Sequence, residues 1–280
     1  MTAKKSLVII GGGAAGFFCA VNAARLNTAL DITIIEKTGK LLSKVKVSGG
    51  GRCNVTHACY SIAEMVNKYP RGGSFLKKCF HQFFTTDTIT WFNERGITLN
   101  TEDDGRMFPS TNSSQTIIDC LLNEAEKYGV DILFNKEVVA LEKQNNKWQL
   151  QFTDHTKLDA DFICIASGGY PKPNQFEWLK NLGHTIASPT PSLFTFNVPG
   201  NSINALMGVS VENAIVKITG TKLNESGALL VTHWGFSGPA VLKLSAWGAR
   251  ELAKCNWQFT ILINWLPAFN EQTLKEKILE

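Results

Sequence analysis

Residues 6–16 read SLVIIGGGAAG, and most of what can be predicted for this chain follows from them. The apolar run 6–10 is typical of a strand buried on both faces of a parallel sheet. Residues 14–27, rich in Ala and Phe, predict a helix, and residues 31–36 predict a second buried strand. Strand, glycine turn, helix and strand make a βαβ unit, which predicts an α/β fold with a parallel sheet.

The turn from Gly11 to Gly16 matches G-x-G-x-x-G, and it follows a predicted strand and opens a predicted helix. Gly11 permits the tight turn, Gly13 lets the backbone approach a pyrophosphate, and Gly16 allows close helix–strand packing. The helix start, with Ala15 in its first turn, offers N–H groups and a positive dipole end to phosphates. A glycine-rich turn in an unrelated α/β protein is the alternative interpretation.

Glu36 ends the second predicted strand, 20 residues after Gly16. An acidic residue at this position accepts hydrogen bonds from a ribose. Because a carboxylate repels a 2′-phosphate, the site favours FAD or NAD over NADP.

A second glycine cluster, SGGGRCN, occupies residues 48–54 within a stretch, 37–57, that we expect to be a long loop. Consecutive glycines cost folding entropy, which makes sense where the backbone passes close to a planar ligand or phosphate. Basic residues surround the cluster and suit an anion: Lys37, Lys40, Lys44, Lys46 and Arg52. A solvated flexible loop is the alternative. Cys53 resembles a reactive thiol beside an arginine, but without a C-x-x-C partner we favour a small residue packed near a cofactor.

Further elements complete the first part of the chain. We expect helices at 74–84, 87–95 and 114–128, a strand at 131–134, a hairpin of 138–142 with 148–153 around Asn145-Asn146, and a buried strand at 161–166. From Pro189 onward, prolines separate short segments that resemble strands. We therefore divide the chain into domains 1–190 and 191–280. Asn270 caps a predicted helix at 271–280 that has no stop signal, and we expect the chain to halt inside an element.

Composition excludes several classes of protein. Apolar residues make up 44% of the 280 and charged residues 19%, which excludes disorder. The net charge of +4 is too small to indicate nucleic acid or an anionic membrane as partner. No apolar run is long enough for a membrane span, and Gly11–Gly13 interrupts the signal-like stretch after Lys4 and Lys5. Seven scattered cysteines and five scattered histidines indicate no disulfide scaffold and no metal site, so we expect a cytoplasmic protein.

Four blocks resemble one known family: Gly11–Gly16 with Glu36; SGGGRCNVT at 48–56; GRMFPS at 105–110; and LLVTHWGFSGPAVLKLS at 229–245. The segment IASGG at 165–169 adds to the match, with Ser167 in place of the usual Thr. On these blocks the chain is similar to bacterial flavoproteins of the aminoacetone-oxidase-like and dehydro-bile-acid-reductase-like group of NAD(P)/FAD-dependent oxidoreductases.

The resemblance implies a Rossmann-like FAD-binding domain of the two-dinucleotide-binding type, with an inserted, mostly-β second domain that is incomplete at the C-terminus. It implies that Gly11, Gly13, Gly16 and Glu36 hold the ADP half of FAD, and that Val138 meets the adenine through its backbone. Other positions would lie near the pyrophosphate and flavin or pass under the cofactor: Gly50, Gly51, Arg52, Asn54, Ala166, Gly168 and Gly169. Ala15, Lys37 and Ser48 complete the predicted cofactor-binding set. The glycine-rich run usual after IASGG is missing, which puts FAD binding by this chain in doubt.

The expected function is therefore an FAD-dependent oxidoreductase that transfers hydride between a small organic substrate and the flavin, with NAD(P)H or O2 as redox partner. His233, in the THWGFSGP segment, is the candidate proton donor; a structural turn is the alternative. A degenerate or truncated nucleotide-binding protein without catalysis, and an FAD-dependent RNA-modifying protein, are the other functions considered. The sequence leaves the oligomeric state and the substrate open.

Overall fold

The computed structural model describes residues 4–170 and 172–279. The chain separates into two compact units, Met1–Ala187 and Ser188–Glu280. This division lies three residues before the predicted boundary at 190/191. Each unit has its own core, and we describe them one at a time.

A four-stranded parallel sheet forms the centre of the first unit. Its strands are β1 (Lys5–Ile10), β2 (Leu30–Ile35), β6 (Asp131–Leu133) and β10 (Phe162–Ile165), in the order β10-β1-β2-β6. Helix α1 (Ala14–Leu26) connects β1 to β2 and completes the predicted βαβ unit. The strand predicted at 161–166 is present as β10, but the expectation that it is buried was wrong: it is an edge strand, and Phe162 and Ile165 are 47% and 40% exposed.

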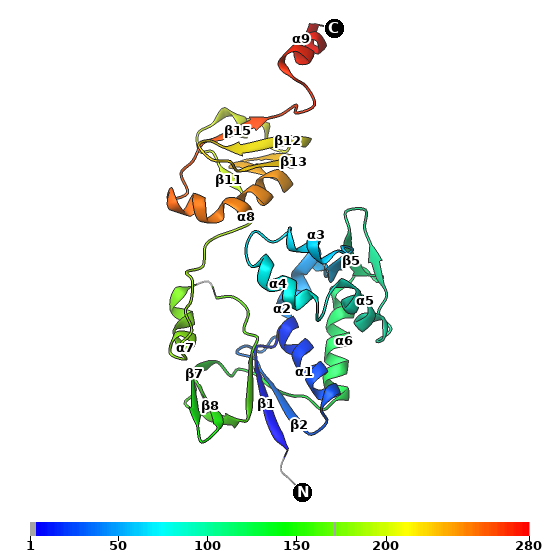
Figure 1. The fold of residues 1–280 in the computed structure, drawn as a ribbon, viewed down its shortest axis with the longest axis vertical. Coiled ribbons are helices and arrows are strands. Elements are labelled where there is room, and N and C mark those ends of the chain that lie inside the picture. The colour runs from blue at the N-terminus through cyan, green and yellow to red at the C-terminus, as the bar shows by residue number, and fades with distance from the viewer. Residues whose placement is uncertain (1–3, 171, 280) are drawn as a thin grey trace. The chain divides into compact units, whose positions relative to one another are not determined.

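Two layers cover this sheet (Figure 1), because successive side chains of a strand point to opposite faces. Ile9 packs with Phe17 of α1 and Leu121 of α6 (Ser114–Lys127). Val8 and Ile10 instead pack against an antiparallel sheet of β7 (Val138–Gln144), β8 (Lys147–Phe152) and β9 (Lys157–Ala160).

The stretch 37–57 is not a plain loop, which corrects the prediction. It contains helix α2 (Ser43–Val47), a 3-10 helix (Ser48–Gly51) and strand β3 (Thr56–His57). β3 pairs with β5 (Arg106–Pro109), which pairs with β4 (Leu99–Thr101), so the GRMFPS block is a strand beside the second glycine cluster. The pairing of β3 with β5 joins residues about 50 positions apart, so the sequence around the glycine cluster did not show it.

Local signals located helix α6 and the β7–β8 hairpin, whereas α3, α7 and the 3-10 helix at 173–176 were not predicted. Ser113 accepts the N–H of Gln115 at 3.3 Å to cap α6, and Gly129 follows the helix at φ +64°. Asn145 and Asn146 both have positive φ in the β7–β8 turn. The remaining helices of this unit are α3 (Ile62–Val66), α4 (Gly73–Phe80), α5 (Thr85–Asn93), a 3-10 helix (Pro173–Phe176) and α7 (Glu177–Lys180).

The second unit is an antiparallel sheet in the order β11-β14-β13-β12-β15, with a core of Val216, Leu229 and Leu244 among others. Its elements are β11 (Phe196–Asn197), a 3-10 helix (Ser202–Leu206), β12 (Ser210–Ile218), β13 (Asn224–Thr232), β14 (Gly235–Ser237), α8 (Pro239–Lys254), β15 (Ile261–Asn264) and α9 (Glu271–Leu279). Asn270 Oδ1 accepts the N–H of Thr273 at 2.9 Å, as expected of a cap. Glu280, the last residue of that predicted helix, lies outside the described residues.

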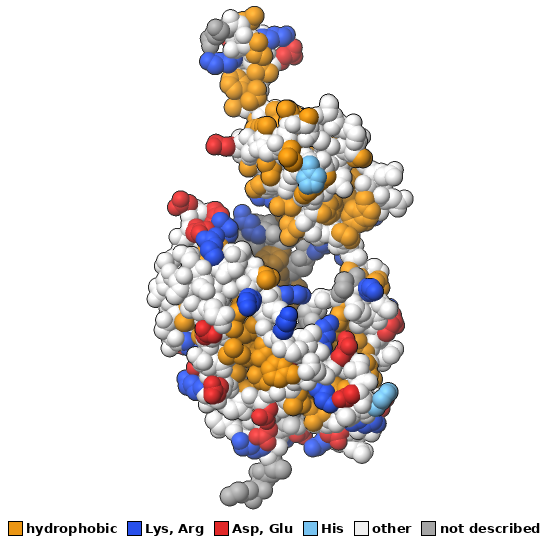
Figure 2. Space-filling view, turned by 180° about the vertical axis from the view of Figure 1, so that it is seen from behind, with side chains coloured by type: hydrophobic (Ala, Val, Ile, Leu, Met, Phe, Trp, Pro, Cys, Tyr) orange, Lys and Arg blue, Asp and Glu red, His pale blue; other side chains and the backbone are white. Residues whose placement is uncertain are grey.

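The charge pattern agrees with the small net charge. Basic and acidic side chains are interspersed over the face of the first unit in Figure 2. Within residues 4–170 and 172–279, no helix has the length and apolar character needed to cross a bilayer.

Candidate functional site

In the first glycine turn, other backbone atoms lie so close to the two outer glycines, Gly11 and Gly16, that no side chain fits there. Gly11 donates its N–H to Ile35 O at 2.8 Å, and a Cβ on Gly11 would lie 2.4 Å from Ala166 O. A Cβ on Gly16 would lie 1.9 Å from Gly11 O, so α1 packs against β1 only with glycine at this position. Gly16 therefore has the predicted packing role, while Gly11 also lets the end of β10 approach the turn.

Gly13 faces open space, since a Cβ built on it would have no atom within 4 Å. It is the N-cap of α1, and no side chain caps this helix. The first N–H groups of a helix have no intrahelical acceptor and carry the positive end of the dipole. This combination leaves a backbone surface that suits a phosphate.

Glu36 is held against the turn by its carboxylate. Oε2 accepts the N–H of Gly12 at 3.0 Å, and Oε1 accepts the N–H and the hydroxyl of Thr38, each at 2.9 Å. A carboxylate accepts about four hydrogen bonds, so a lone pair of Oε2 is left for a ribose hydroxyl. The geometry thus agrees with the predicted role of Glu36.

A narrow crevice of about 50 Å³ adjoins Glu36 at the carboxyl ends of β1 and β2. It brings together the predicted Gly11, Glu36, Lys37 and Val138, and adds residues that the sequence analysis missed: Ile10, Ile35, Lys136, Glu137, Ser167 and Tyr170. The Tyr170 ring lies 5.6 Å from Lys37 Nζ and 5.0 Å from the Phe176 ring, measured to centroids. The one available signal for Tyr170 was its place directly after Gly168-Gly169.

A second, larger hollow of about 550 Å³ also borders the turn. Ala14 and Ala15 of the turn line it together with Lys44, Ser48 and Asn54, which supply polar groups. The rest of the lining is mainly apolar and includes Phe18 of α1, Phe92 of α5 and Leu121 of α6. The predicted Ala15, Ser48 and Asn54 therefore line one cavity at the start of α1.

The second glycine cluster has a backbone conformation that favours glycine at three consecutive positions. Gly49, Gly50 and Gly51 have φ of +56°, +69° and +86°. A Cβ on Gly49 would lie 2.8 Å from the N of Asn54, whereas Gly50 and Gly51 have no atom closer than 4.0 Å. The cluster makes a tight left-handed turn whose last two glycines are open.

Arg52 turns toward the mini-sheet of β3, β5 and β4. Its guanidinium pairs with Glu102 at 2.5 Å and stacks over Phe108 at 4.0 Å. The Arg52 guanidinium thus interacts with Glu102 and Phe108 within the protein. Its predicted proximity to the pyrophosphate stays a prediction.

Cys53 is buried, and burial raises the pKa of its thiol although the Ser48 side chain lowers it somewhat. A raised pKa disfavours the thiolate that a nucleophile needs. The structure therefore supports the interpretation of Cys53 as a packed residue.

The end of β10 returns to the turn. Ala166 donates its N–H to Ile10 O at 2.9 Å, and Gly168 follows at φ +71°. A Cβ on Gly169 would meet nothing within 4 Å. Ala166 thus lies against Gly11, two residues before Gly168, and the predicted place of this segment under the cofactor stays a prediction.

His233 belongs to the second unit, in the turn between β13 and β14. Its exposed ring contacts Trp234 edge-on at 4.1 Å, and Trp234 donates to Thr195 Oγ1 at 3.1 Å. The role of His233 as proton donor stays a prediction. Among the described residues no His, Cys, Asp and Glu side chains gather as a metal site would require.

The first unit fits FAD part by part. Gly13 and the start of α1 suit the diphosphate, and Glu36 suits the ribose of the adenosine half; the predicted contact of Val138 with the adenine stays a prediction. Bound FAD supplies hydride transfer, a chemistry that amino-acid side chains lack.

The family model described as "HI0933-like protein Rossmann domain" matches residues 5–237. The ribosomal RNA dihydrouridine synthase of Haemophilus influenzae is 30% identical over 276 residues, covering 94% of this chain and 65% of that protein. Its counterpart of the same name in Escherichia coli is 30% identical over 259 residues, covering 89% and 62%. The 3-dehydro-bile acid delta(4,6)-reductase of Clostridium scindens is 23% identical over 276 residues, covering 96% and 66%. The chain thus spans 62% to 66% of the length of these relatives.

Proposed function

This chain belongs to the HI0933-like protein Rossmann domain family, whose relatives include flavoprotein oxidoreductases, and on that premise we propose that it forms the FAD-binding part of a reductase. The proposed reaction adds hydrogen across a carbon–carbon double bond conjugated to a carbonyl group. The observation that carries the proposal is the joint arrangement of open Gly13 and oriented Glu36 at the start of α1.

The reaction class comes from the chemistry that the relatives' names share. One name describes formation of dihydrouridine and another describes reduction of delta(4,6) double bonds in a 3-dehydro bile acid. The double bond of uracil is conjugated to a ring carbonyl, and so are those of a 3-keto steroid with double bonds at these positions. In both, hydride adds to the carbon remote from the carbonyl, and a proton then adds to the neighbouring carbon.

The proposed substrate is a uracil base of ribosomal RNA. Two relatives with this substrate in their name are 30% identical, against 23% for the bile-acid reductase. The proposal adopts the RNA-modifying alternative of the sequence analysis over the small organic substrate. The absence of a nucleic-acid partner, expected from the net charge of +4, stays an untested prediction.

The residues of this chain act by binding and orienting. The N–H groups at the start of α1 bind phosphate, Glu36 binds the ribose, and the apolar walls of the 550 Å³ hollow limit the access of water to that side of the turn. NADH or NADPH is the proposed electron donor, as in the sequence analysis.

The test uses the full-length protein. We expect a yellow protein whose flavin is bleached by NADH or NADPH without oxygen, and whose colour returns on adding an unmodified ribosomal RNA transcript. Mass spectrometry of the digested RNA should then show uridine that has gained two hydrogens. The matched control is Gly13→Val, which should be colourless and inactive.

Other results separate the alternatives. Reoxidation by a steroid enone but not by RNA would overturn the RNA substrate and retain the reaction class. Reoxidation by O2 alone would indicate an oxidase. A colourless full-length protein that takes up no FAD would contradict the whole proposal and favour a degenerate nucleotide-binding protein.

A further inference from the structure

We propose that Lys44 is the side-chain cation that binds the diphosphate of the dinucleotide at the Gly11–Gly16 turn. The inference rests on the FAD-binding part of the proposed function and is independent of the substrate. Two other basic side chains near the turn are directed elsewhere: Arg52 pairs with Glu102 and stacks over Phe108, and Lys37 lies over the Tyr170 ring at the crevice beside Glu36.

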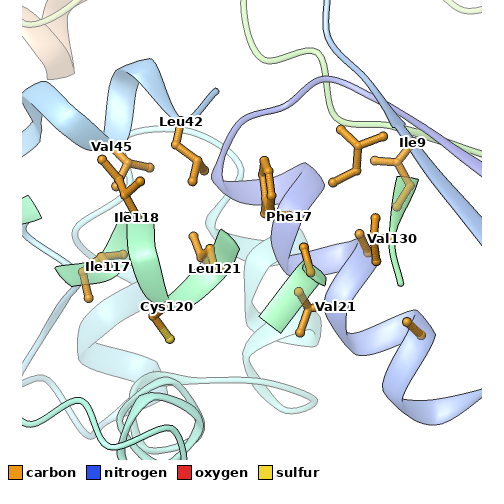
Figure 3. Close-up of a cluster of buried hydrophobic side chains, with 14 of the residues drawn as sticks. Ile9, Phe17, Val21, Leu42, Val45, Ile117, Ile118, Cys120, Leu121 and Val130 are labelled. Atoms are coloured by element: carbon orange, nitrogen blue, oxygen red, sulfur yellow. The ribbon is translucent and has the colours of Figure 1, made fainter. Parts of the chain in front are cut away.

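The helix that carries Lys44 is tied directly to the turn. Leu42, which precedes α2, donates its N–H to Gly12 O at 2.9 Å and adopts φ +53°. Its side chain and that of Val45 are buried in the core of the first unit with Phe17 and Ile118 (Figure 3). α2 is thus anchored on one side and exposes Lys44.

Two independent observations locate the Lys44 side chain at the phosphate-binding surface. Lys44 lines the 550 Å³ hollow together with Ala14 and Ala15, the first residues of α1. Its Nζ also lies 3.6 Å from the position that a Cβ on Gly168 would take. The side chain therefore extends between the start of α1 and the segment after β10, which themselves meet at Gly11 and Ala166.

The charge of Lys44 is uncompensated within the protein. Lys44 is exposed, and among residues 4–170 and 172–279 no carboxylate is within ion-pair distance of its Nζ. Lys136, by contrast, pairs with Asp154 at the edge of the adenosine crevice. A cation beside a helix start and three closely spaced backbone segments gives the complementary charge that a diphosphate needs.

Lys46 provides a matched control on the same short helix. It is also exposed and also without a carboxylate partner among the described residues, but it does not line the hollow. Its backbone carbonyl accepts the Ser114 hydroxyl at 2.9 Å, a bond that side-chain substitution leaves in place. Lys44→Met and Lys46→Met therefore remove the same charge at two positions two residues apart.

The experiment titrates full-length apoprotein with FAD and, separately, with ADP, following flavin fluorescence or displacement of FAD. We expect Lys44→Met to weaken both affinities roughly 10- to 100-fold, the range for a charge-assisted hydrogen bond. Lys46→Met should change them less than about twofold, and Lys44→Arg should retain most of the affinity because it keeps the charge. Circular dichroism checks that the variants fold.

Several results would overturn the assignment. Equal losses for Lys44→Met and Lys46→Met would indicate general electrostatic attraction. Loss of FAD but not ADP affinity, with a shifted flavin potential, would move Lys44 to the flavin ring, and loss of RNA affinity alone would assign it to the RNA backbone. If Lys44→Met does not fold, a Lys44→Arg variant that folds but loses affinity for both ligands would equally reject the charge as the cause. If the protein binds FAD but does not reduce uridine, the proposed substrate is rejected, whereas the assignment of Lys44 to the diphosphate still stands.

Discussion

The two glycine clusters of the first unit look alike in sequence and differ in physical cause. In Gly11–Gly16 the outer glycines exist because backbone oxygens lie 2.4 and 1.9 Å from where a Cβ would be. In Gly49–Gly51 all three residues have positive φ, as Gly11 also does. A Cβ on Gly49 would lie 2.8 Å from Asn54 N, but Gly50 and Gly51 have free space around them. The first cluster is a packing contact between elements; the second is a backbone turn.

This difference predicts which property of the protein a substitution in each cluster changes. A side chain at Gly16 forces a helix away from a strand, so the cost falls on the fold. A side chain at Gly13, by contrast, costs the fold little and occupies the space above the turn. A side chain at Gly50 costs only the strain of a left-handed residue. Substitutions can therefore separate stability, cofactor binding and local strain.

The largest effect is expected from Gly13→Val, which should abolish FAD retention because the side chain occupies the pyrophosphate position. The free energy of unfolding should change little, since no atom lies within 4 Å of a Cβ there. Flavin absorbance after gel filtration and a urea titration measure the two quantities. Wild-type flavin content in the variant would show that the turn is not the site.

Gly16→Ala should do the reverse and lower the free energy of unfolding by about 3 kcal/mol or more. Its Cβ would be 1.9 Å from Gly11 O, a backbone atom that cannot move without shifting α1 or β1. Urea unfolding followed by circular dichroism gives the value, with Gly13→Ala as control. Equal stabilities of the two variants would contradict the packing cause.

Glu36→Ala should weaken FAD binding by roughly 1–3 kcal/mol, the range for a hydrogen bond involving a charged group. The variant also removes the acceptor of the Gly12 N–H. Isothermal titration measures the affinity, and Glu137→Ala, which removes another exposed acid lining the same crevice, is the control. If both variants bind FAD equally well, Glu36 does not hold the ribose.

Gly50→Ala in the second cluster should cost only about 1 kcal/mol of stability, because strain at φ +69° is partly offset by a less flexible unfolded chain. The same urea assay measures it. A loss as large as that of Gly16→Ala would erase the distinction between the two clusters.

The smallest expected effect is a slow alkylation of Cys53, which follows the second cluster. Burial raises the pKa of its thiol, so at mildly alkaline pH less thiolate is present than in an ordinary cysteine. Iodoacetamide should label the exposed Cys79 and Cys255 first, and Cys53 only as the pH rises further or the protein unfolds. Mass spectrometry of the labelled peptides reads this out, and early labelling of Cys53 would revive it as a reactive thiol.

Local patterns were enough for the βαβ unit, the caps of α6 and the Asn145-Asn146 hairpin. In each, the residues that act are neighbours in the chain, so their spacing alone predicts the structure. The same holds for the packing role of Gly16, in the first turn of α1.

Only the tertiary structure places Lys44 and Tyr170 near the turn. It also pairs Arg52 with Glu102 and puts β10 at the edge of its sheet. These features depend on which segments pair across tens to hundreds of residues. A side chain's own neighbours in the sequence carry no record of that pairing, because the contact is chosen by the packing of the whole unit.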